Sequence, residues 1–309
     1  MDSVFIQGLL AAAVRIAAPL MMGALGGLIS ERAGVFAVGI EGMMLSGAFG
    51  AAVGTYMTNN VLLGLAAAVL AGSLVAAVAA VAVTRFRSDQ MVTGLAINIL
   101  AFGLTGFLIR GLFGGHPPAI RISLFGPLRV PVLSGVPIVG PILFAQPVLT
   151  YTALALALVL HLFLYRTKAG LALRATGENP EAVYAAGHDP IRIRQAAVAV
   201  CGAVAGLGGA VLVLQDVGTF TDGMTNGRGF LALAALIVGR WTPLGALLSC
   251  LIFGAAAALE VRLQGVDFAV SSYVIQMVPY VVALVVLTAL GRGSRMPQAI
   301  GRAYQTRGA

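Results

Sequence analysis

Charge is what this sequence most lacks. Only 10% of its 309 residues are charged, whereas a soluble domain averages about 25%. Aromatic residues are also few, at 7%, while 59% of the chain is hydrophobic and 40 residues are glycine. Most of the chain therefore does not meet water, and its glycines allow helices to approach closely in lipid. The composition predicts an all-α polytopic membrane protein in which residues 1–309 form a single transmembrane domain.

Lysine is nearly absent, and so are the motifs of covalent catalysis. Lys168 is the only lysine, and Ala169 follows it. The phosphate-binding loop of an ATPase requires Gly-Lys followed by Ser or Thr, so the chain does not contain one. The nucleophile motif Gly-x-Ser-x-Gly does not occur either. We therefore expect a protein that is not an enzyme.

Cysteine and histidine are too sparse for a disulfide framework or a metal site. Cys201 and Cys250 both fall within apolar runs, where they are expected to act as small packing residues. His116, His161 and His188 are isolated and far apart in the sequence. We expect His161, which lies in an apolar run, to pack or to join two helices. No cofactor or metal is predicted for this chain.

Long apolar runs fill most of the sequence. A membrane span requires about 20 mostly apolar residues. The candidate runs are Val4–Ile29, Val35–Met57, Val61–Thr84, Met91–Phe113, Pro147–Tyr165, Ala196–Gln215, Gly229–Gly239, Pro243–Leu263 and Ala269–Leu290. The seventh covers only about 16 Å as a helix and is therefore expected to be a half-helix or to extend towards Thr225. The runs predict a bundle of 8–10 transmembrane helices.

The basic residues indicate the orientation of the bundle. They form short clusters between apolar runs, with no continuous basic stretch, which argues against a nucleic-acid partner. Alternate crossing gathers most of them on the side of the C-terminus, which the positive-inside rule identifies as the cytoplasm. The prediction is a cytoplasmic loop at 166–195, an extracytoplasmic loop at 114–146, a cytoplasmic tail at 291–309 and an N-terminus outside.

The cytoplasmic loop contains a sequence typical of a short capped helix, Pro180–Ala186. Asn179 is a good N-cap, proline suits the first position, and Glu181 lies favourably on the positive end of the helix dipole. Gly187 suits the left-handed position that ends a helix. Because so short a helix is marginal alone in water, it must dock on something, either its own bundle or a separate cytoplasmic protein.

Polar residues within the apolar runs are candidates for a transport pathway. Arg15 and Glu41 lie in the first two runs and could pair with each other or enter another buried network. Glu41 could instead line the pathway. Asn98 could bind a ribose or a base edge, or simply join two helices. Phe36 could stack on a base or pack against apolar neighbours.

Two segments resemble a known family. GENPEAVYAAGHDPIRIR, from Gly177, is similar to the coupling loop of ABC importer permeases, and ERAGVFAVGIEGMMLSGAF, from Glu31, resembles permeases of the branched-chain amino acid, ribose and nucleoside class. Within that class the second segment most resembles the nucleoside and simple-sugar subgroup. Ala37 departs from the subgroup, in which Asn is expected. The resemblance implies that the loop contacts an ATPase through Gly177, Asn179, Pro180, Glu181, Ala182, Ala186 and Gly187.

The resemblance also implies a function and a set of partners. The chain would be the permease of an ATP-driven nucleoside importer in a bacterial inner membrane, working by alternating access. A separate ATPase would bind ATP-Mg, a periplasmic or lipoprotein solute-binding protein would deliver substrate, and a second permease, different or identical, would complete the pathway. The alternatives are a simple-sugar permease, an ion-coupled secondary transporter using Glu41, and a membrane-embedded enzyme. The capped helix disfavours the transporter, and the missing catalytic motifs disfavour the enzyme.

Overall fold

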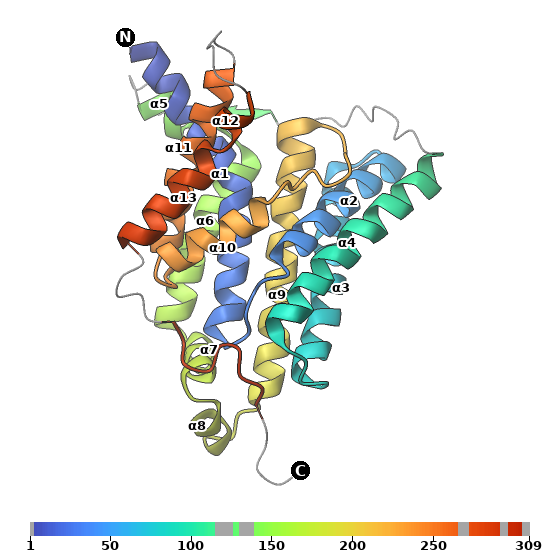
Figure 1. Cartoon of the computed structure of the whole chain (residues 1–309), viewed down its shortest axis with the longest axis vertical. Coiled ribbons are helices and arrows are strands. Elements are labelled where there is room, and N and C mark those ends of the chain that lie inside the picture. The colour runs from blue at the N-terminus through green and yellow to red at the C-terminus, as the bar shows by residue number, and fades with distance from the viewer. Residues whose placement is uncertain (1–2, 115–125, 130–138, 265–271, 291–295, 305–309) are drawn as a thin grey trace.

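The computed structural model describes residues 3–114, 126–129, 139–264, 272–290 and 296–304. Its elements are the helices α1 (Ser3–Arg32), α2 (Ile40–Thr58), α3 (Val61–Thr84), α4 (Gln90–Phe113), α5 (Val139–Leu143), α6 (Val148–Arg166), α7 (Lys168–Glu178), α8 (Pro180–Ala185), α9 (Pro190–Val211) with a π-helical end η2 (Leu212–Val217), α10 (Arg228–Val238), α11 (Pro243–Gln264), α12 (Ser272–Gln276) and α13 (Val278–Leu290), and the strands β1 (Pro127–Arg129) and β2 (Ala145–Pro147). Figure 1 shows these elements as an elongated helical bundle.

The helices confirm the predicted all-α membrane fold. Within the described ranges, six helices are long and apolar enough to cross a membrane: α1, α3, α4, α6, α9 and α11. The 19-residue helix α2, the 11-residue helix α10 and the short pair α12–α13 supply further segments. The seventh predicted run is the half-length helix α10, as its 11 residues indicated.

Two helices begin elsewhere than the apolar runs suggested. α2 begins at Ile40, not at Val35, because residues 33–39 form two turns joined by a non-helical stretch, and Gly34 in the first turn has φ +90°. α9 begins at Pro190, six residues before the predicted run, because the Asp189 side chain accepts hydrogen bonds from the first backbone amides. The polar first turn of α9 therefore extends that helix beyond its apolar run.

Helices α1 and α9 occupy the centre of the bundle. α9 packs on α1, α2 and α3, while α1 also packs on α11, α10 and α6; in Figure 1, α2–α4 lie on one side of this pair and α6, α11 and α13 on the other. Small residues allow the closest approach, since a Cβ placed on Gly47 of α2 would lie 2.3 Å from the Cα of Gly206 in α9. Such small-residue contacts replace water expulsion as the source of helix association in lipid.

The two ends of the bundle differ. α7, α8 and the segment 296–304 lie at one end, below the long helices in Figure 1, and we call this the α8 end. The opposite end contains the start of α1, α5, α12 and the antiparallel pair β1–β2, in which Pro127 faces Pro147. The described part of the predicted loop 114–146 therefore contains a short helix and two short strands; its residues 115–125 and 130–138, with His116, lie outside the described ranges.

Candidate functional site

The N-terminal end of α8 is capped as the sequence predicts. The Oδ1 atom of Asn179 accepts a hydrogen bond from the backbone N–H of Ala182 at 3.1 Å, and proline occupies the first helical position. Glu181 stands in the first turn, where its charge favours the helix dipole. The helix ends at Ala185, one residue before the predicted end, and Ala186 is its C-cap.

The C-terminal end of α8 closes on a left-handed glycine. Gly187 has φ +84°, which confirms the predicted conformation. Its N–H donates to the carbonyl of Tyr184 at 2.9 Å, and the N–H of His188 donates to the carbonyl of Val183 at 3.1 Å. This pair of hydrogen bonds is the Schellman motif, which satisfies carbonyls that the helix leaves without partners.

α8 buries little of its own surface. Val183 is its one buried side chain, whereas Tyr184 is 55% exposed and the other residues of α8 except Pro180 are exposed. A six-residue helix with one buried side chain has little to stabilise it beyond its caps. The outer face of α8, with small residues around Tyr184, is therefore available to another protein.

Helix α7, which precedes α8, was missed by the sequence analysis, which predicted only the short helix Pro180–Ala186 within the loop 166–195. The Thr167 hydroxyl caps α7 by accepting from the N–H of Gly170 at 3.0 Å. Its buried residues Gly170, Leu173 and Gly177 repeat every three or four positions, which is the spacing of an amphipathic helix. That spacing and the Thr cap were the signals available in the sequence.

Gly177, expected among the coupling residues, lies where three segments meet. A Cβ at this position would lie 2.3 Å from the carbonyl oxygen of Arg32 at the end of α1, so the approach requires glycine. The carbonyl of Gly177 accepts a hydrogen bond from the N–H of Ala299 at 2.8 Å. The base of α8 is thus joined both to the bundle and to the segment 296–304.

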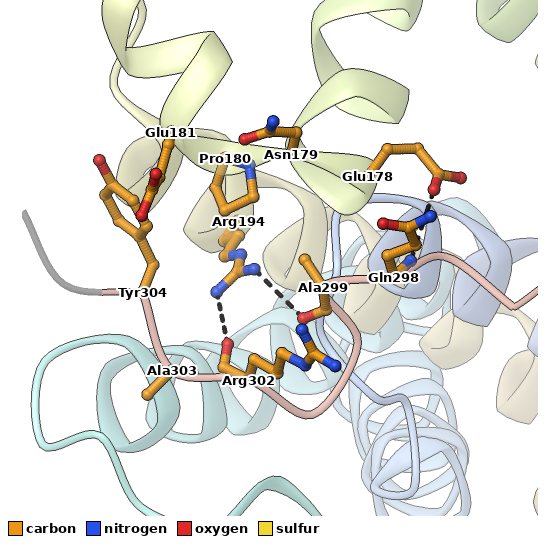
Figure 2. Close-up of a pocket in the computed structure, with 10 residues that line it drawn as sticks. All are labelled: Glu178, Asn179, Pro180, Glu181, Arg194, Gln298, Ala299, Arg302, Ala303 and Tyr304. Atoms are coloured by element: carbon orange, nitrogen blue, oxygen red, sulfur yellow. Dashed lines mark hydrogen bonds between the residues drawn. The ribbon is translucent and has the colours of Figure 1, made fainter.

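Arg194 fastens the same segment from α9. Its guanidinium is buried, and it donates to the carbonyls of Ala33 at 3.2 Å, Arg302 at 2.9 Å and Ala299 at 3.4 Å. Figure 2 shows two of these hydrogen bonds beside a cavity of about 500 Å³. Three carbonyls from two distant segments therefore share one cation, which holds the segment 296–304 under α7 and α8.

The cavity beside Arg194 is bordered by charges of both signs. Glu178 and Glu181 line it together with Arg302 and Tyr304. Partial burial and the neighbouring Tyr184 and Glu181 raise the pKa of the Tyr304 hydroxyl above its usual value. The α8 end therefore has a mixed polar surface suited to a protein partner.

The end of α1 is tied to the turn between α10 and α11. The buried Glu31 accepts hydrogen bonds from the indole N–H of Trp241 at 2.5 Å and from the N–H of Ala37 at 3.3 Å. Arg32 donates from Nε to the carbonyl of Trp241 at 2.7 Å. The start of the motif that carried the family resemblance therefore joins the end of α1 to the turn before α11. Its signal in the sequence was the charged pair Glu31 and Arg32 at the end of a helix. Ala37, the departure from the subgroup, is buried in this packing.

Glu41 connects α2 to the half-helix α10. Its carboxylate accepts hydrogen bonds from the backbone N–H groups of Gly227 at 2.8 Å and Gly229 at 2.6 Å, so it caps the positive end of α10. It thus enters a buried network with α10, and among the described residues it forms no ion pair with Arg15. Tyr280 of α13 donates to the carbonyl of Asn226 at 3.1 Å beside this end of α10.

Asn98 and Phe36 lie close to the start of α2. The Asn98 side chain accepts from the N–H of Gly42 at 2.8 Å and donates to the carbonyl of Val38 at 3.0 Å, so it joins α4 to α2. The N–H of Phe36 donates to Gln90 of α4 at 2.7 Å. The structure brings Glu41 and Asn98 to the first turn of α2, while their role in a pathway remains a prediction.

No group of three or more possible metal ligands occurs among the residues described. His161 contacts the ring of Tyr165, with centroids 4.9 Å apart, and His188 lies just beyond the C-terminal cap of α8, where it is exposed. Cys201 and Cys250 are both buried and free. The two cysteines and His161 thus lie in packed surroundings, as expected of them.

Comparison with known proteins gives one consistent result. The family model described as "Branched-chain amino acid transport system / permease component" matches residues 9–289. The chain is 35% identical to the guanosine ABC transporter permease protein NupQ of Bacillus subtilis, covering 98% of both chains. It is 34% identical to the nucleoside ABC transporter permease protein NupC of Lactococcus lactis, covering 93% of both. A candidate glucose ABC transporter permease protein of Haloferax volcanii, TsgC13, is 37% identical over 86% of this chain and 80% of its own. No solved structure gives a significant match.

Proposed function

Because the chain belongs to the permease family of branched-chain amino acid transport systems, and is thus a membrane subunit of an ABC importer that does not itself hydrolyse ATP, we propose that it imports nucleosides. The proposal rests on NupQ, the guanosine permease that aligns with 98% of the chain. The alignment with NupC over 93% of the chain points to the same class of substrate.

The observation that carries the coupling role is the capped and outward-facing helix α8. The ATPase docks on α8, whose Asn179 and Gly187 caps keep it helical and whose small exposed residues allow close approach. Movement of α8 is transmitted through Gly177 and Arg194 to α1, α9 and the segment 296–304, because these contacts join the loop to the bundle. ATP-Mg binds on that ATPase and not on this chain.

The pathway passes the start of α10. A half-helix that ends inside the layer leaves backbone groups near the midplane, where transporters bind substrate. Glu41 holds this end of α10 by two amide hydrogen bonds, and Asn98 holds the adjacent start of α2. Alternating access changes the relation of α2 to α10, and Phe36, Glu41 and Asn98 line the route that opens.

The partners follow from this arrangement. An ATPase and a solute-binding protein are the partners that an ABC importer permease implies. We assign the α8 end to the cytoplasm and the end with β1 and β2 to the solute-binding protein, because the positive-inside rule places Arg85, Arg166 and Arg192 inside. A second permease, different in sequence, completes the pathway in the inner membrane.

The test is uptake by proteoliposomes that contain this chain, its ATPase, its partner permease and the solute-binding protein. Radiolabelled guanosine is expected to enter only when ATP is present on the α8 side. Uptake by this chain alone, driven by an ion gradient, would remove the importer assignment. If ATP drives uptake of another solute but not of guanosine, the importer assignment stands and the proposed nucleoside substrate is wrong.

A simple sugar is the second candidate substrate, because TsgC13 is 37% identical over 86% of the chain. The same vesicles distinguish the two when labelled guanosine and labelled glucose compete at equal concentration. An excess of unlabelled guanosine is expected to abolish uptake of label, while unlabelled glucose is expected to leave it unchanged. If unlabelled glucose inhibits the uptake and unlabelled guanosine does not, a simple sugar and not a nucleoside is the substrate.

A further inference from the structure

An apolar groove of about 820 Å³ runs along the surface between α6 and α9. Leu160 and Phe163 of α6 form one wall, Ala196 and Val200 of α9 form the other, and Ala172 of α7 closes the end. Val200 and other wall residues are exposed to the outside of the bundle. Nothing in the transport role described above uses this groove.

The groove has the depth of one leaflet. On α6, which ends at Arg166, the groove extends back to Leu156, 10 residues before that end. α9 begins at Pro190, and its last lining residue, Val200, lies 10 residues on. At 1.5 Å per residue the groove therefore reaches about 15 Å in from the ends of both helices, which is half of the ~30 Å hydrocarbon layer.

The closed end of the groove is basic. Lys168, the first residue of α7, and His188, two residues before α9, both line it. The same two side chains line an adjoining hollow of about 330 Å³ between α7 and α8. Lys168 lies two residues after the end of α6, and His188 lies two residues before the start of α9. Both therefore lie at the level of the lipid headgroups. None of the residues lining either cavity is acidic.

We propose that the groove binds one anionic phospholipid. One acyl chain lies between α6 and α9, and the phosphate contacts the Lys168 ammonium and an imidazole N–H of His188 in the hollow between α7 and α8. A basic pocket between membrane helices at the membrane surface favours an anionic headgroup, and an apolar groove that reaches one leaflet deep fits an acyl chain. A membrane helix of a partner would be equally apolar but would leave the lysine without a counter-charge.

The lipid would act on the loop that contains α8. Lys168 begins α7 and His188 donates the backbone hydrogen bond that closes the α8 cap. A phosphate that contacts both side chains bridges the two ends of the segment 168–188. Bound lipid is therefore expected to hold α7 and α8 in one position relative to the bundle.

The test is lipid retention by the purified chain in detergent, measured by native mass spectrometry. Phosphatidylglycerol and phosphatidylcholine with identical acyl chains are the probes. We expect one phosphatidylglycerol to be retained in preference to phosphatidylcholine. Lys168→Gln should weaken its binding about fivefold, the effect of one cation near a headgroup, while Arg85→Gln, a cation removed at the same end of the bundle away from the groove, should leave binding unchanged.

A second pair of variants tests the acyl-chain wall. Ala196→Phe fills the groove and should reduce retention of both lipids, while the matched change Ala77→Phe on the exposed face of α3 should not. Equal retention of both lipids, or equal loss with Lys168→Gln and Arg85→Gln, would overturn the proposal. Displacement of the lipid by soluble glycerol phosphate would show that a headgroup alone suffices and would overturn it too. So would crosslinking of Ala196→Cys to another protein subunit in native membranes. The measurement requires neither ATPase nor substrate, so its outcome is independent of the transport assignment.

Discussion

Gly187→Val is the most informative single change at α8, the helix on which we propose that the ATPase docks. The backbone of Gly187 has φ +84°, and a Cβ there would have no neighbouring atom within 4 Å. The cost is therefore conformational and not steric. An L-residue in the left-handed region costs about 1–2 kcal/mol, and a β-branched residue is a stronger outlier. α8 has one buried side chain to oppose this cost, so we expect its C-terminal cap to open.

The open space around Gly187 predicts a graded series. Gly187→Asn should be mild, because Asn tolerates the left-handed conformation. Gly187→Ala should be intermediate and Gly187→Val the most severe. Since 1.4 kcal/mol changes an equilibrium tenfold, a cost of about 1–2 kcal/mol lowers the capped population of α8 about 5- to 30-fold.

The assay is co-purification of the ATPase with each variant, together with ATP-stimulated uptake. Both should fall in the order Asn, Ala, Val, while membrane insertion and binding of the solute-binding protein at the far end stay normal. Glu181→Lys places a cation on the positive end of α8 and should weaken docking by an independent route. If Gly187→Val and Glu181→Lys both recruit the ATPase and transport at wild-type rates, α8 is an ordinary loop helix and the coupling role is refuted.

Three further outcomes follow from the structure. Thr58→Cys and Gln298→Cys should be labelled by a membrane-impermeant reagent from opposite sides, and labelling from one side would refute the crossing pattern. Glu41→Ala removes the acceptor of two amide hydrogen bonds and should lower the melting temperature and uptake, because a hydrogen bond to a charged group contributes about 1.5–3 kcal/mol; unchanged melting would contradict the capping role. Gly206→Leu should prevent the close packing of α9 on α3, because a Cβ there already lies 2.5 Å from the carbonyl oxygen of Ala68, and should abolish recovery of folded protein by size-exclusion chromatography; Gly103→Leu, whose Cβ meets nothing within 4 Å, should be tolerated.

The membrane helices could be predicted from the sequence because the bilayer imposes a length and a composition on each span. The starts of two helices could not. α9 begins six residues before its apolar run, because Asp189 and a polar first turn extend it out of the hydrocarbon. α2 begins late because a turn at Gly34 takes up the first apolar residues. Apolarity marks the buried part of a helix and not its ends.

The caps of α8 could be predicted because a cap is local, involving Asn179, Gly187 and their near neighbours. The contacts of Glu41 and Arg194 could not, since their partners are backbone amides and carbonyls that every residue possesses. The sequence indicated only that Glu41, inside an apolar run, needed a partner. The Glu31–Trp241 hydrogen bond spans 210 positions, and its place depends on how α1 meets α10 and α11.

The contacts between Arg194 and the segment 296–304 affect the order in which this protein is completed during synthesis. α8 leaves the ribosome more than 100 residues before Ala299 and Arg302, whose carbonyls Arg194 holds. Until those residues are made, Arg194 lacks two of the three carbonyls to which it donates, and the underside of α7 is uncovered. A chain truncated in or before α13 would therefore lack the segment 296–304 against α7, at the end where we propose that the ATPase docks. The α8 end is therefore complete only once the chain has been made as far as Arg302.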